Sequence, residues 1–378
     1  MNNRTDPFCG YYLFLGRGDW GTSREKTLDP TFGGNVPTQL LGDWGPHRKG
    51  TDLADAPEWS SAWGPDEWKQ RVDFLADELG ADTLILCMNG YELPYPSEAF
   101  PEAVERDHAN VRREFLQELL DYARDRGLTL GASLCTTGHA RGYAQAHPEL
   151  TVVGATGQDK SDNLCHNNPG GRHYAQTVTR EILTRYRGFE WVSFHPPENT
   201  QACRCEHCAR AFAAETGTDF VRAGAEQVTD FYWRSCLRFQ RRMELLAAEL
   251  VPAAKFFSFT IPGTFEKHFD AVEEMLPDTT MLVHWDYWSY GQRIPELLTS
   301  LDLFRSRGHR VGFAASSGWS LDKLGERYGE SVLDQIRAVR GAGIRDLLYF
   351  VGAIWHEASL RATSWKLHGK EGNTAHAE

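Results

Sequence analysis

The sequence lacks the features of several protein classes. None of its apolar runs approaches the ~20 residues that a membrane-spanning helix needs. It has no block of lysine and arginine and a formal net charge of −12, which disfavours a nucleic-acid-binding protein with a basic face. The first apolar stretch is too short and too aromatic for the core of a signal peptide, and no small-residue cleavage site follows it. We therefore expect a cytoplasmic protein with neither a membrane nor a nucleic acid as partner.

Eight short runs rich in branched and aromatic residues recur along the 378 residues, and amphipathic helical patterns separate most of them. The expected strands are residues 8–16, 82–88, 128–134, 189–194, 254–260, 279–285, 310–315 and 346–352. The expected helices are residues 66–79, 107–126, 172–187, 220–250, 295–307 and 329–340. Strands that alternate with helices form a parallel sheet, and eight of them close a barrel. We therefore predict an α/β protein with a single (β/α)8 TIM barrel and long βα loops over residues 1–370, followed by a loose tail at 371–378.

In such a barrel the chemistry lies at the carboxyl ends of the strands. In this sequence those ends carry Asp, Glu, His, Asn, Tyr and Trp, a set typical of a carbohydrate site, because polar side chains bind hydroxyls and flat rings stack on sugar faces. The candidate substrate contacts are Asp19, Asn89, Tyr91, His139, His195, Trp285, Tyr287, Trp319, Trp355 and Glu357. For any one of the aromatic residues, a role in plugging the barrel mouth is an equally good interpretation.

Two acidic residues are candidates for glycosidic cleavage, which commonly uses one carboxyl group to protonate the leaving oxygen and another to attack or to activate water. Glu198, just past the fourth expected strand, is the candidate acid, although an exposed loop residue is the alternative. Asp286, at the end of the sixth strand, is the candidate base, and its separation from Glu198 would admit a water and favour inversion. Glu357 is the reserve base. A structural contact between Asp286 and Arg293 is an equally good interpretation.

The segment 20–63 has little strand or helix periodicity, and loops of this length in a compact domain are usually functional or disordered. Its aromatic residues predict a packed lid over the barrel mouth. A contact with a second copy of the chain in a homo-oligomer fits the same observation.

Three of the eight cysteines, Cys203, Cys205 and Cys208, lie within one short turn. Disulfides are disfavoured in a cytosolic protein, so a tight cluster indicates a metal site. Thiolates bind Zn²⁺ tetrahedrally, which requires a fourth ligand. Cys165, on the loop that leaves the third strand, is the preferred ligand, and His207 is the rival. A closed four-thiolate site is structural, so we expect a structural Zn²⁺ with no role in catalysis.

The cysteine pattern also carries a resemblance. Cys165 followed by Asn167-Asn168-Pro169, then Glu198 after a strand, then Cys203-x-Cys205-x-x-Cys208 resembles glycoside hydrolase family 42 β-galactosidases and related glycosidase-like barrels, roughly over residues 145–212. The resemblance implies that these four cysteines hold a structural zinc and that Glu198 is the acid/base residue.

The sequence departs from the family at two positions. The acid/base glutamate of the family follows an asparagine, whereas Pro197 precedes Glu198 here. The nucleophile of the family is a glutamate on strand seven, and the seventh expected strand ends here without a carboxylate. We therefore expect a glycoside hydrolase that cleaves a small saccharide or glycoside. A carbohydrate lyase, a substrate-assisted hydrolase and a non-catalytic sugar-binding barrel are the alternatives.

Overall fold

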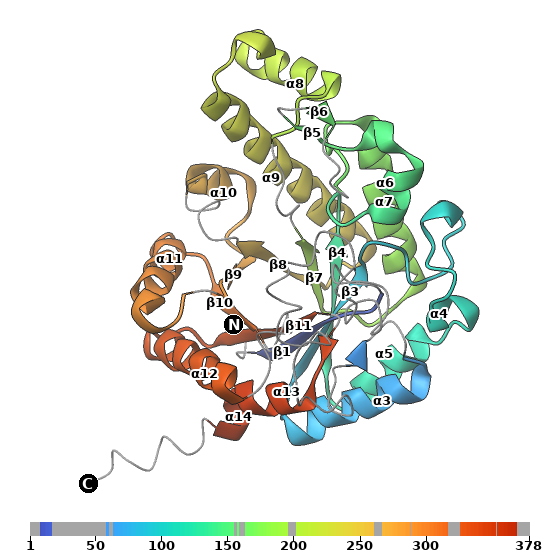
Figure 1. Ribbon diagram of the computed structural model, residues 1–378, viewed down its shortest axis with the longest axis vertical. Helices are drawn as coiled ribbons and strands as arrows, with labels where there is room; N and C mark the ends of the chain where they lie inside the picture. Colours follow the sequence, from blue (N-terminus) through green and yellow to red (C-terminus); the bar gives the residue numbers. More distant parts are fainter. Residues whose placement is uncertain are drawn as a thin grey trace, which may run out of the picture.

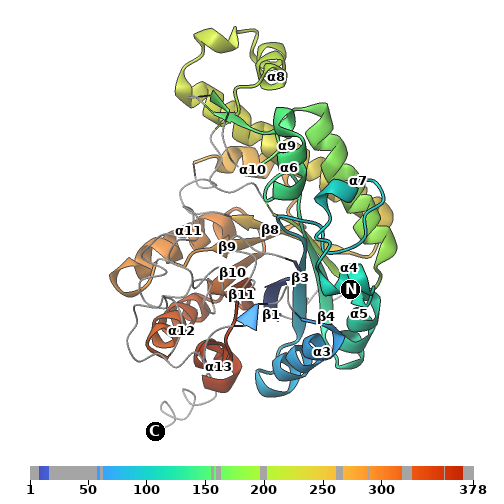
Figure 2. The same ribbon diagram turned by 45° about the vertical axis from the view of Figure 1, so that its right-hand side comes forward.

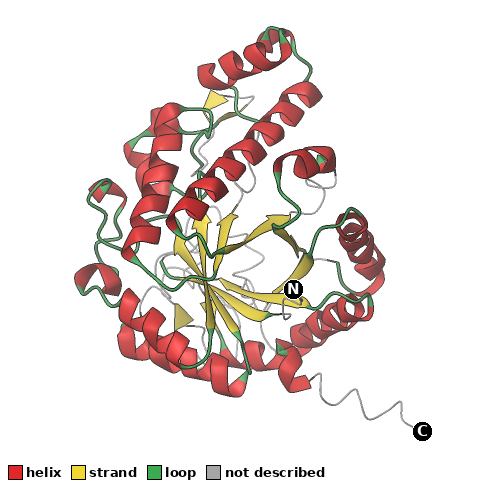
Figure 3. Ribbon diagram, turned by 180° about the vertical axis from the view of Figure 1, so that it is seen from behind, coloured by secondary structure: helices red, strands yellow, loops and turns green. Residues whose placement is uncertain are grey.

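The computed structural model describes residues 8–16, 58–59, 63–154, 157–158, 163–195, 202–260, 267–287, 289–316, 326–352 and 354–368. Eight parallel strands form a closed barrel in the order β1-β11-β10-β9-β8-β7-β4-β3, and helices surround it (Figures 1 and 3). The strands are β1 (Cys9–Phe14), β3 (Thr83–Asn89), β4 (Thr129–Cys135), β7 (Trp191–His195), β8 (Lys255–Thr260), β9 (Met281–Trp285), β10 (Val311–Ser316) and β11 (Asp346–Gly352). The predicted TIM barrel and its eight strands are confirmed, with small shifts at the strand ends.

The helices cover the outside of the barrel or lie in the loops above it (Figure 3). They are α3 (Pro65–Asp73), α4 (Ala109–Arg112), α5 (Leu116–Asp125), α6 (Arg141–Ala146), α7 (Pro169–Arg185), α8 (Glu206–Thr216), α9 (Ala225–Leu250), α10 (Phe269–Met275), α11 (Ile294–Ser306), α12 (Glu326–Gly341), α13 (Glu357–Thr363) and α14 (Trp365–His368). A π-helical turn, η3 (Phe74–Glu78), extends α3. The 3-10 turns are η4 (Pro101–Ala103), η5 (Pro148–Leu150), η6 (Phe220–Arg222) and η7 (Gly291–Arg293). In the part of the chain that the structure describes, no helix has the length and apolar character needed to cross a membrane.

One predicted helix is wrong in a specific way. The expected helix 107–126 is divided into α4 and α5, with a break between Arg112 and Leu116 that Asn110 stabilises. The side-chain oxygen of Asn110 accepts hydrogen bonds from the backbone N–H groups of Phe115 (2.9 Å) and Leu116 (2.8 Å). These bonds satisfy two of the N–H groups that a helix leaves unpaired at its start, so α5 begins there.

Side chains along each barrel strand alternate between two apolar layers. The outward side chains pack under the helices in one large cluster. The inward side chains fill the barrel with aromatic rings: Phe8, Tyr12, Phe14, Trp191, Phe257, Phe259, Trp285 and Phe350. A Cβ atom on Gly131 would clash with the side chain of Ile85 inside this cluster, so a glycine is needed at that point of β4. The barrel is therefore a packed core, and ligands have access only at its ends.

A small lobe projects beyond the barrel at the N-terminal end of α9 (Figures 1 and 2). It contains α8, η6 and the hairpin of β5 (Val153–Gly154) and β6 (Gly157–Gln158). We call residues 151–154, 157–158, 163–168 and 202–235 the cysteine lobe. Its interior consists of two small clusters: Val152, Cys165, Cys203, Cys208 and Tyr232, and Phe212, Phe220, Val228 and Phe231.

Candidate active site and cysteine centre

Five of the predicted site residues form a continuous row of rings across the carboxyl-terminal mouth of the barrel. Tyr91 follows β3, His139 follows β4, His195 ends β7, Trp285 ends β9 and Tyr287 follows it. Neighbouring ring centroids in this order lie 5.4, 5.3, 5.0 and 5.4 Å apart, and each ring presents its edge to the next. We call these five residues the ring row. The structure therefore brings together side chains from four strand ends, as the barrel prediction required.

A second set of aromatic residues lies against the ring row from inside the barrel. The ring of Trp285 lies 5.0 Å from that of Phe259 and 4.7 Å from that of Phe350. Tyr12 stacks on Phe350 at 5.2 Å. At the other end of the row, the guanidinium of Arg141 lies 4.0 Å from the centre of the Tyr91 ring. The sequence analysis missed these residues as contributors to the site, although the inward alternation along β8 and β11 was available as a signal.

His139 has a backbone conformation that residues other than glycine rarely adopt, with a φ of 53°. Its backbone N–H donates a hydrogen bond to Oδ1 of Asn163 (3.2 Å), a residue farther along the same loop. A left-handed residue other than glycine costs of order 1–3 kcal/mol and persists where its surroundings hold it. The loop therefore fixes the imidazole of His139 between Tyr91 and His195.

Asn89, another predicted substrate contact, binds the next strand. Its side-chain Nδ2 donates to the carbonyl of Cys135 (2.7 Å), and its Oδ1 accepts from the backbone N–H of Cys135 (3.0 Å). These bonds tie the end of β3 to the end of β4, where the register of the two strands shifts. A contact between Asn89 and substrate stays a prediction.

Asp286, the candidate base, is buried directly after β9, between two members of the ring row, and is 4% exposed. Its Oδ1 accepts a hydrogen bond from the backbone N–H of Ser289 (3.0 Å), and the amide of Gln335 donates to the carbonyls of both residues (3.4 and 3.0 Å). The turn after β9 is thus held from both sides. Arg293 forms an ion pair with Glu296 (3.1 Å). The alternative, a structural contact between Arg293 and Asp286, stays a prediction.

Two predicted site residues lie in the outer layer of the molecule. Trp355 is 2% exposed, and its ring packs edge to face against Trp63 (5.6 Å) and Phe74 (5.5 Å) in the outer cluster. Glu357 starts α13, and its carboxylate lies 3.7 Å from the guanidinium of Arg71 on α3. These contacts join the last helices to α3. The structure therefore places Trp355 and Glu357 in the helical layer, apart from the ring row.

Other predictions fall on residues outside the described part of the chain. Glu198, Asp19 and Trp319 are among them, as is most of the segment 20–63. Within that segment, β2 (Glu58–Trp59) pairs antiparallel with β12 (Ile354–Trp355) after β11. The catalytic role of Glu198, the lid and the sugar contacts of Asp19 and Trp319 stay predictions.

The sequence analysis also missed a buried carboxylate. Glu105, on the loop after β3, is 3% exposed. Its Oε2 lies 3.3 Å from the point that a Cβ atom on Gly16 would occupy, just past the end of β1. The carboxylate therefore reaches the mouth from a loop that carries no recognisable motif.

The four cysteines predicted as metal ligands converge in the cysteine lobe. The Sγ atoms of Cys165, Cys203, Cys205 and Cys208 all lie within 4.8 Å of one another. The sulfur of Cys165 lies 3.6 Å from that of Cys205 and 3.5 Å from that of Cys208. Tetrahedral coordination with metal–sulfur bonds of about 2.3 Å separates sulfurs by about 3.8 Å. The arrangement can therefore bind a metal ion, and we call it the cysteine centre.

The surroundings of the cysteine centre suit thiolate ligands. The backbone N–H of Val153 donates to the sulfur of Cys203 (3.4 Å), and Nδ2 of Asn167 donates to that of Cys208 (3.4 Å). Such outer contacts orient ligands and disperse their charge.

The rival ligand, His207, points away from the cysteine centre. Its Nδ1 lies 2.9 Å from the guanidinium of Arg210, and its Nε2 lies 3.5 Å from the carboxylate of Glu206. The four other cysteines of the chain, Cys9, Cys87, Cys135 and Cys236, are free and buried, as the sequence predicts. Cys165 is therefore the fourth member of the cluster.

No family model matches the chain, and no curated protein matches it in sequence. Solved structures of glycoside hydrolases share its barrel. A β-galactosidase from the psychrophilic Marinomonas ef1 has a TM-score of 0.59 at 13% identity, over 82% of this chain and 58% of that one. A GH42 β-galactosidase from G. stearothermophilus has a TM-score of 0.54 at 15% identity, over 82% and 55%. A β-N-acetylhexosaminidase from Bacteroides fragilis has a TM-score of 0.55 at 14% identity, over 96% and 68%. The chain thus spans little more than half of the two β-galactosidases. At these low identities, the structural similarity shows a common fold alone.

Proposed function

We propose that the chain is a glycoside hydrolase that acts on a small saccharide or glycoside at the carboxyl-terminal mouth of the barrel. The observation that carries the proposal is the ring row at the mouth, with the buried residue Asp286 between its last two members in the sequence. Aromatic rings bind the apolar faces of sugars, and imidazole, phenol and carboxylate groups bind their hydroxyls. The barrel that this chain shares with β-galactosidases and a hexosaminidase supports the same class of reaction.

In the proposed mechanism, Glu198, on the loop after β7, protonates the leaving oxygen while the bond to the anomeric carbon breaks. Asp286, after β9, accepts a proton from the water that attacks that carbon from the opposite face. One strand, β8, separates β7 from β9 in the barrel. Attachment to non-adjacent strands suits the ~6.5–9.5 Å that an inverting pair of carboxyl groups requires. The hydrogen bond from Ser289 fixes the orientation of the Asp286 carboxylate.

The test uses unactivated disaccharides and alkyl glycosides, because a good leaving group would mask the loss of a general acid. Glu198→Gln and Asp286→Asn keep the side-chain volume, and each should lower kcat by about 10²-fold or more. Glu226→Gln, at an exposed position near the start of α9, is the matched control and should keep full activity. Proton NMR should show the product anomer inverted. Full activity of Glu198→Gln would exclude Glu198 as the general acid. A wild-type chain that cleaves no glycoside would refute the proposed hydrolase activity.

A second candidate, a non-catalytic sugar-binding barrel, is favoured by one observation. The strand that carries the nucleophile in family 42 corresponds to β10, whose sequence VGFAAS contains no carboxylate. In that case the wild type would bind sugars without turnover, and Glu198→Gln would bind them equally well. A lyase, by contrast, would release an unsaturated product that absorbs in the ultraviolet.

The cysteine centre is proposed to hold a structural Zn²⁺. Cys165, Cys203, Cys205 and Cys208 would supply four thiolates, and such a closed set leaves no open position for substrate. The metal would cross-link the loop after β4 to the segment after β7. Four reduced thiols suit the cytoplasm, which we propose as the location of the protein.

A further inference from the structure

A cavity of about 430 Å³ lies at the base of the cysteine lobe, between α8, α9, the start of α7 and the turn that precedes it. Its polar lining consists of His166, Asn167, Arg172, Glu215, Ser235, Arg238 and Arg242, and apolar side chains of α8 and α9 complete it. None of these residues belongs to the ring row or to the cysteine centre. The cavity is therefore a separate feature of the molecule.

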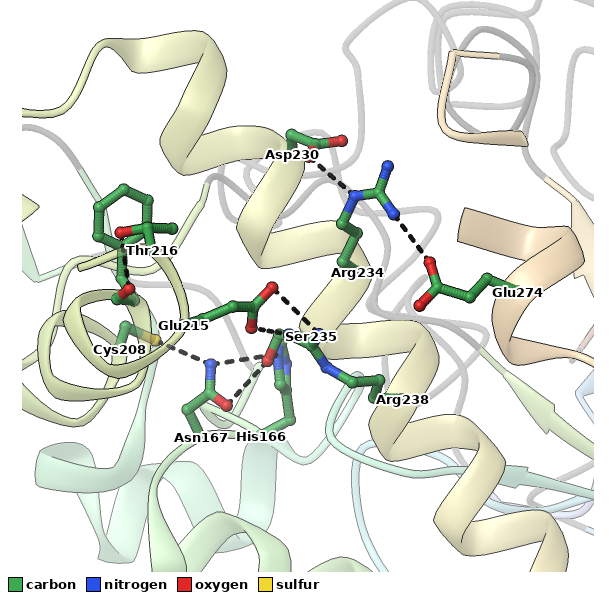
Figure 4. A network of polar contacts seen from close by, with 11 residues as sticks. His166, Asn167, Cys208, Glu215, Thr216, Asp230, Arg234, Ser235, Arg238 and Glu274 are labelled. Carbon is green, nitrogen blue, oxygen red and sulfur yellow. Dashed lines mark hydrogen bonds and ion pairs between the residues drawn. The ribbon is translucent and has the colours of Figure 1, made fainter. Parts of the chain in front are cut away.

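The cavity has an excess of positive charge. Arg238 on α9 and Glu215 on α8 point toward one another and form a two-contact ion pair across the space between the helices (Figure 4). This pair neutralises the one carboxylate of the lining. Arg172 donates to the backbone carbonyl of Asn167 (2.8 Å) and forms no ion pair within the described residues. Arg242 is exposed and has no polar side-chain contact with the described part of the chain. Among the residues that the structure describes, the guanidinium groups of Arg172 and Arg242 thus have no counter-charge.

A buried polar atom also lacks a partner at this cavity. His166 is 1% exposed; its Nε2 contacts Oγ of Ser235 (3.0 Å), which donates to Oδ1 of Asn167 (2.8 Å). Figure 4 shows these three side chains together, close to the Arg238–Glu215 pair. The second ring nitrogen, Nδ1, is buried and has no hydrogen-bond partner among the residues that the structure describes. A buried polar group left in this way costs about 1–3 kcal/mol.

We propose that this cavity binds a small organic anion, a carboxylate or a phosphate monoester, through Arg172 and Arg242. Planar guanidinium groups recognise the oxygens of both anions with paired hydrogen bonds. The volume lies within the ~300–1,000 Å³ of small-molecule sites and suits a molecule of monosaccharide size. Asn167 also donates to the sulfur of Cys208 (3.4 Å), so bound ligand would stabilise the turn that carries Cys165.

The test is calorimetric titration of the full chain with glucose 6-phosphate, inorganic phosphate, glucuronate and glucose. We expect saturable one-to-one binding of at least one anion. Arg242→Gln and Arg172→Gln should each weaken that binding about tenfold or more, because each removes a charge-assisted contact. Arg222→Gln, at an exposed position on η6 of the same lobe, is the matched control and should bind like the wild type.

The pattern of binding identifies the anion. Binding of the two phosphate probes alone assigns the site to phosphate, and binding of glucuronate alone assigns it to carboxylate. If glucose binds with the same affinity as the anions, and Arg242→Gln leaves that affinity unchanged, the sugar binds elsewhere and the proposal is overturned. Absence of saturable anion binding at millimolar concentration, or an equal loss in all three variants, would overturn it as well. Circular dichroism of each variant excludes misfolding as the cause of lost binding.

Discussion

Substitution of Cys208 by alanine provides the sharpest test of how the cysteine lobe is stabilised. The side chain is fully buried, and its sulfur lies 3.5 Å from that of Cys165 and 3.4 Å from Nδ2 of Asn167. Three thiolates cannot complete a tetrahedral site, so Cys208→Ala should lose the metal. The consequence should be local unfolding of the lobe while the barrel remains intact.

The magnitude follows from the length of chain that the metal closes. Cys165 and Cys205 lie 40 positions apart in the sequence. Closing a loop of this length lowers the entropy of the unfolded chain by an amount worth about 4 kcal/mol at 25 °C on the model used for covalent cross-links. The two apolar clusters of the lobe are small, and three members of the first are themselves proposed metal ligands. Because whole domains are stable by only about 5–15 kcal/mol, a loss of this size should open the lobe.

Two measurements check this prediction. Elemental analysis should find about one zinc per wild-type chain and none in Cys208→Ala, because the site has four ligands for a single ion. Hydrogen exchange should increase in α8 and β5 and stay slow in the barrel strands. Cys236→Ala is the control, since Cys236 is buried in α9 and burial raises the pKa of its thiol to about 12. The reasoning fails if the wild type binds no metal, or if Cys208→Ala keeps both its metal and the protection of α8.

Two further predictions concern the barrel. Trp285→Ala removes the ring that joins the ring row to Phe350, so it should lower kcat/KM at least tenfold and the free energy of unfolding by about 3–5 kcal/mol. Trp285→Phe should restore most of the stability. Unchanged kcat/KM of Trp285→Ala on disaccharides would exclude the ring row as the substrate site. Burial raises the pKa of Glu244, so its contribution to stability is full below the ordinary carboxyl pKa and is lost as the pH rises through the raised value. Glu244→Gln should therefore be more stable relative to the wild type at pH 7 than at about pH 4, and urea unfolding that gives the same difference at both pH values would contradict this.

The sequence predicts the barrel well because the signals for its strands are local. A strand buried on both faces, such as β10, is a short apolar run that follows a glycine turn, and the run is visible without knowledge of its neighbours. The break between α4 and α5 is less visible, because it depends on which hydrogen bonds Asn110 makes. Helices such as α6 and α8 lie within long loops and span few turns, so their periodicity is weak.

In the candidate site, too, some residues could be predicted from local sequence and others could not. The ring row could be predicted because each ring lies at the end of a strand or within a few residues after it, and parallel strands in a barrel end at the same rim. Trp355 and Glu357 also come shortly after a barrel strand, β11. However, β12 pairs with β2, which is far away in the sequence, and the chain then enters the outer layer. Glu105 reaches the mouth through a loop contact with Gly16. Such pairings depend on tertiary structure, and no local pattern encodes them.

The ring row and the cysteine centre are connected through the same two loops. The loop after β4 carries His139 and leads to Cys165, and within it the backbone N–H of Leu164 donates to the carbonyl of Thr137 (2.7 Å). The segment after β7 begins at His195 and leads to Cys203. A metal that joins the far ends of these segments restricts the near ends, where two neighbouring imidazoles of the ring row lie 5.3 Å apart. If the proposed metal is bound, a site that takes no part in the proposed chemistry would therefore limit how far Cys165 and Cys203 can separate.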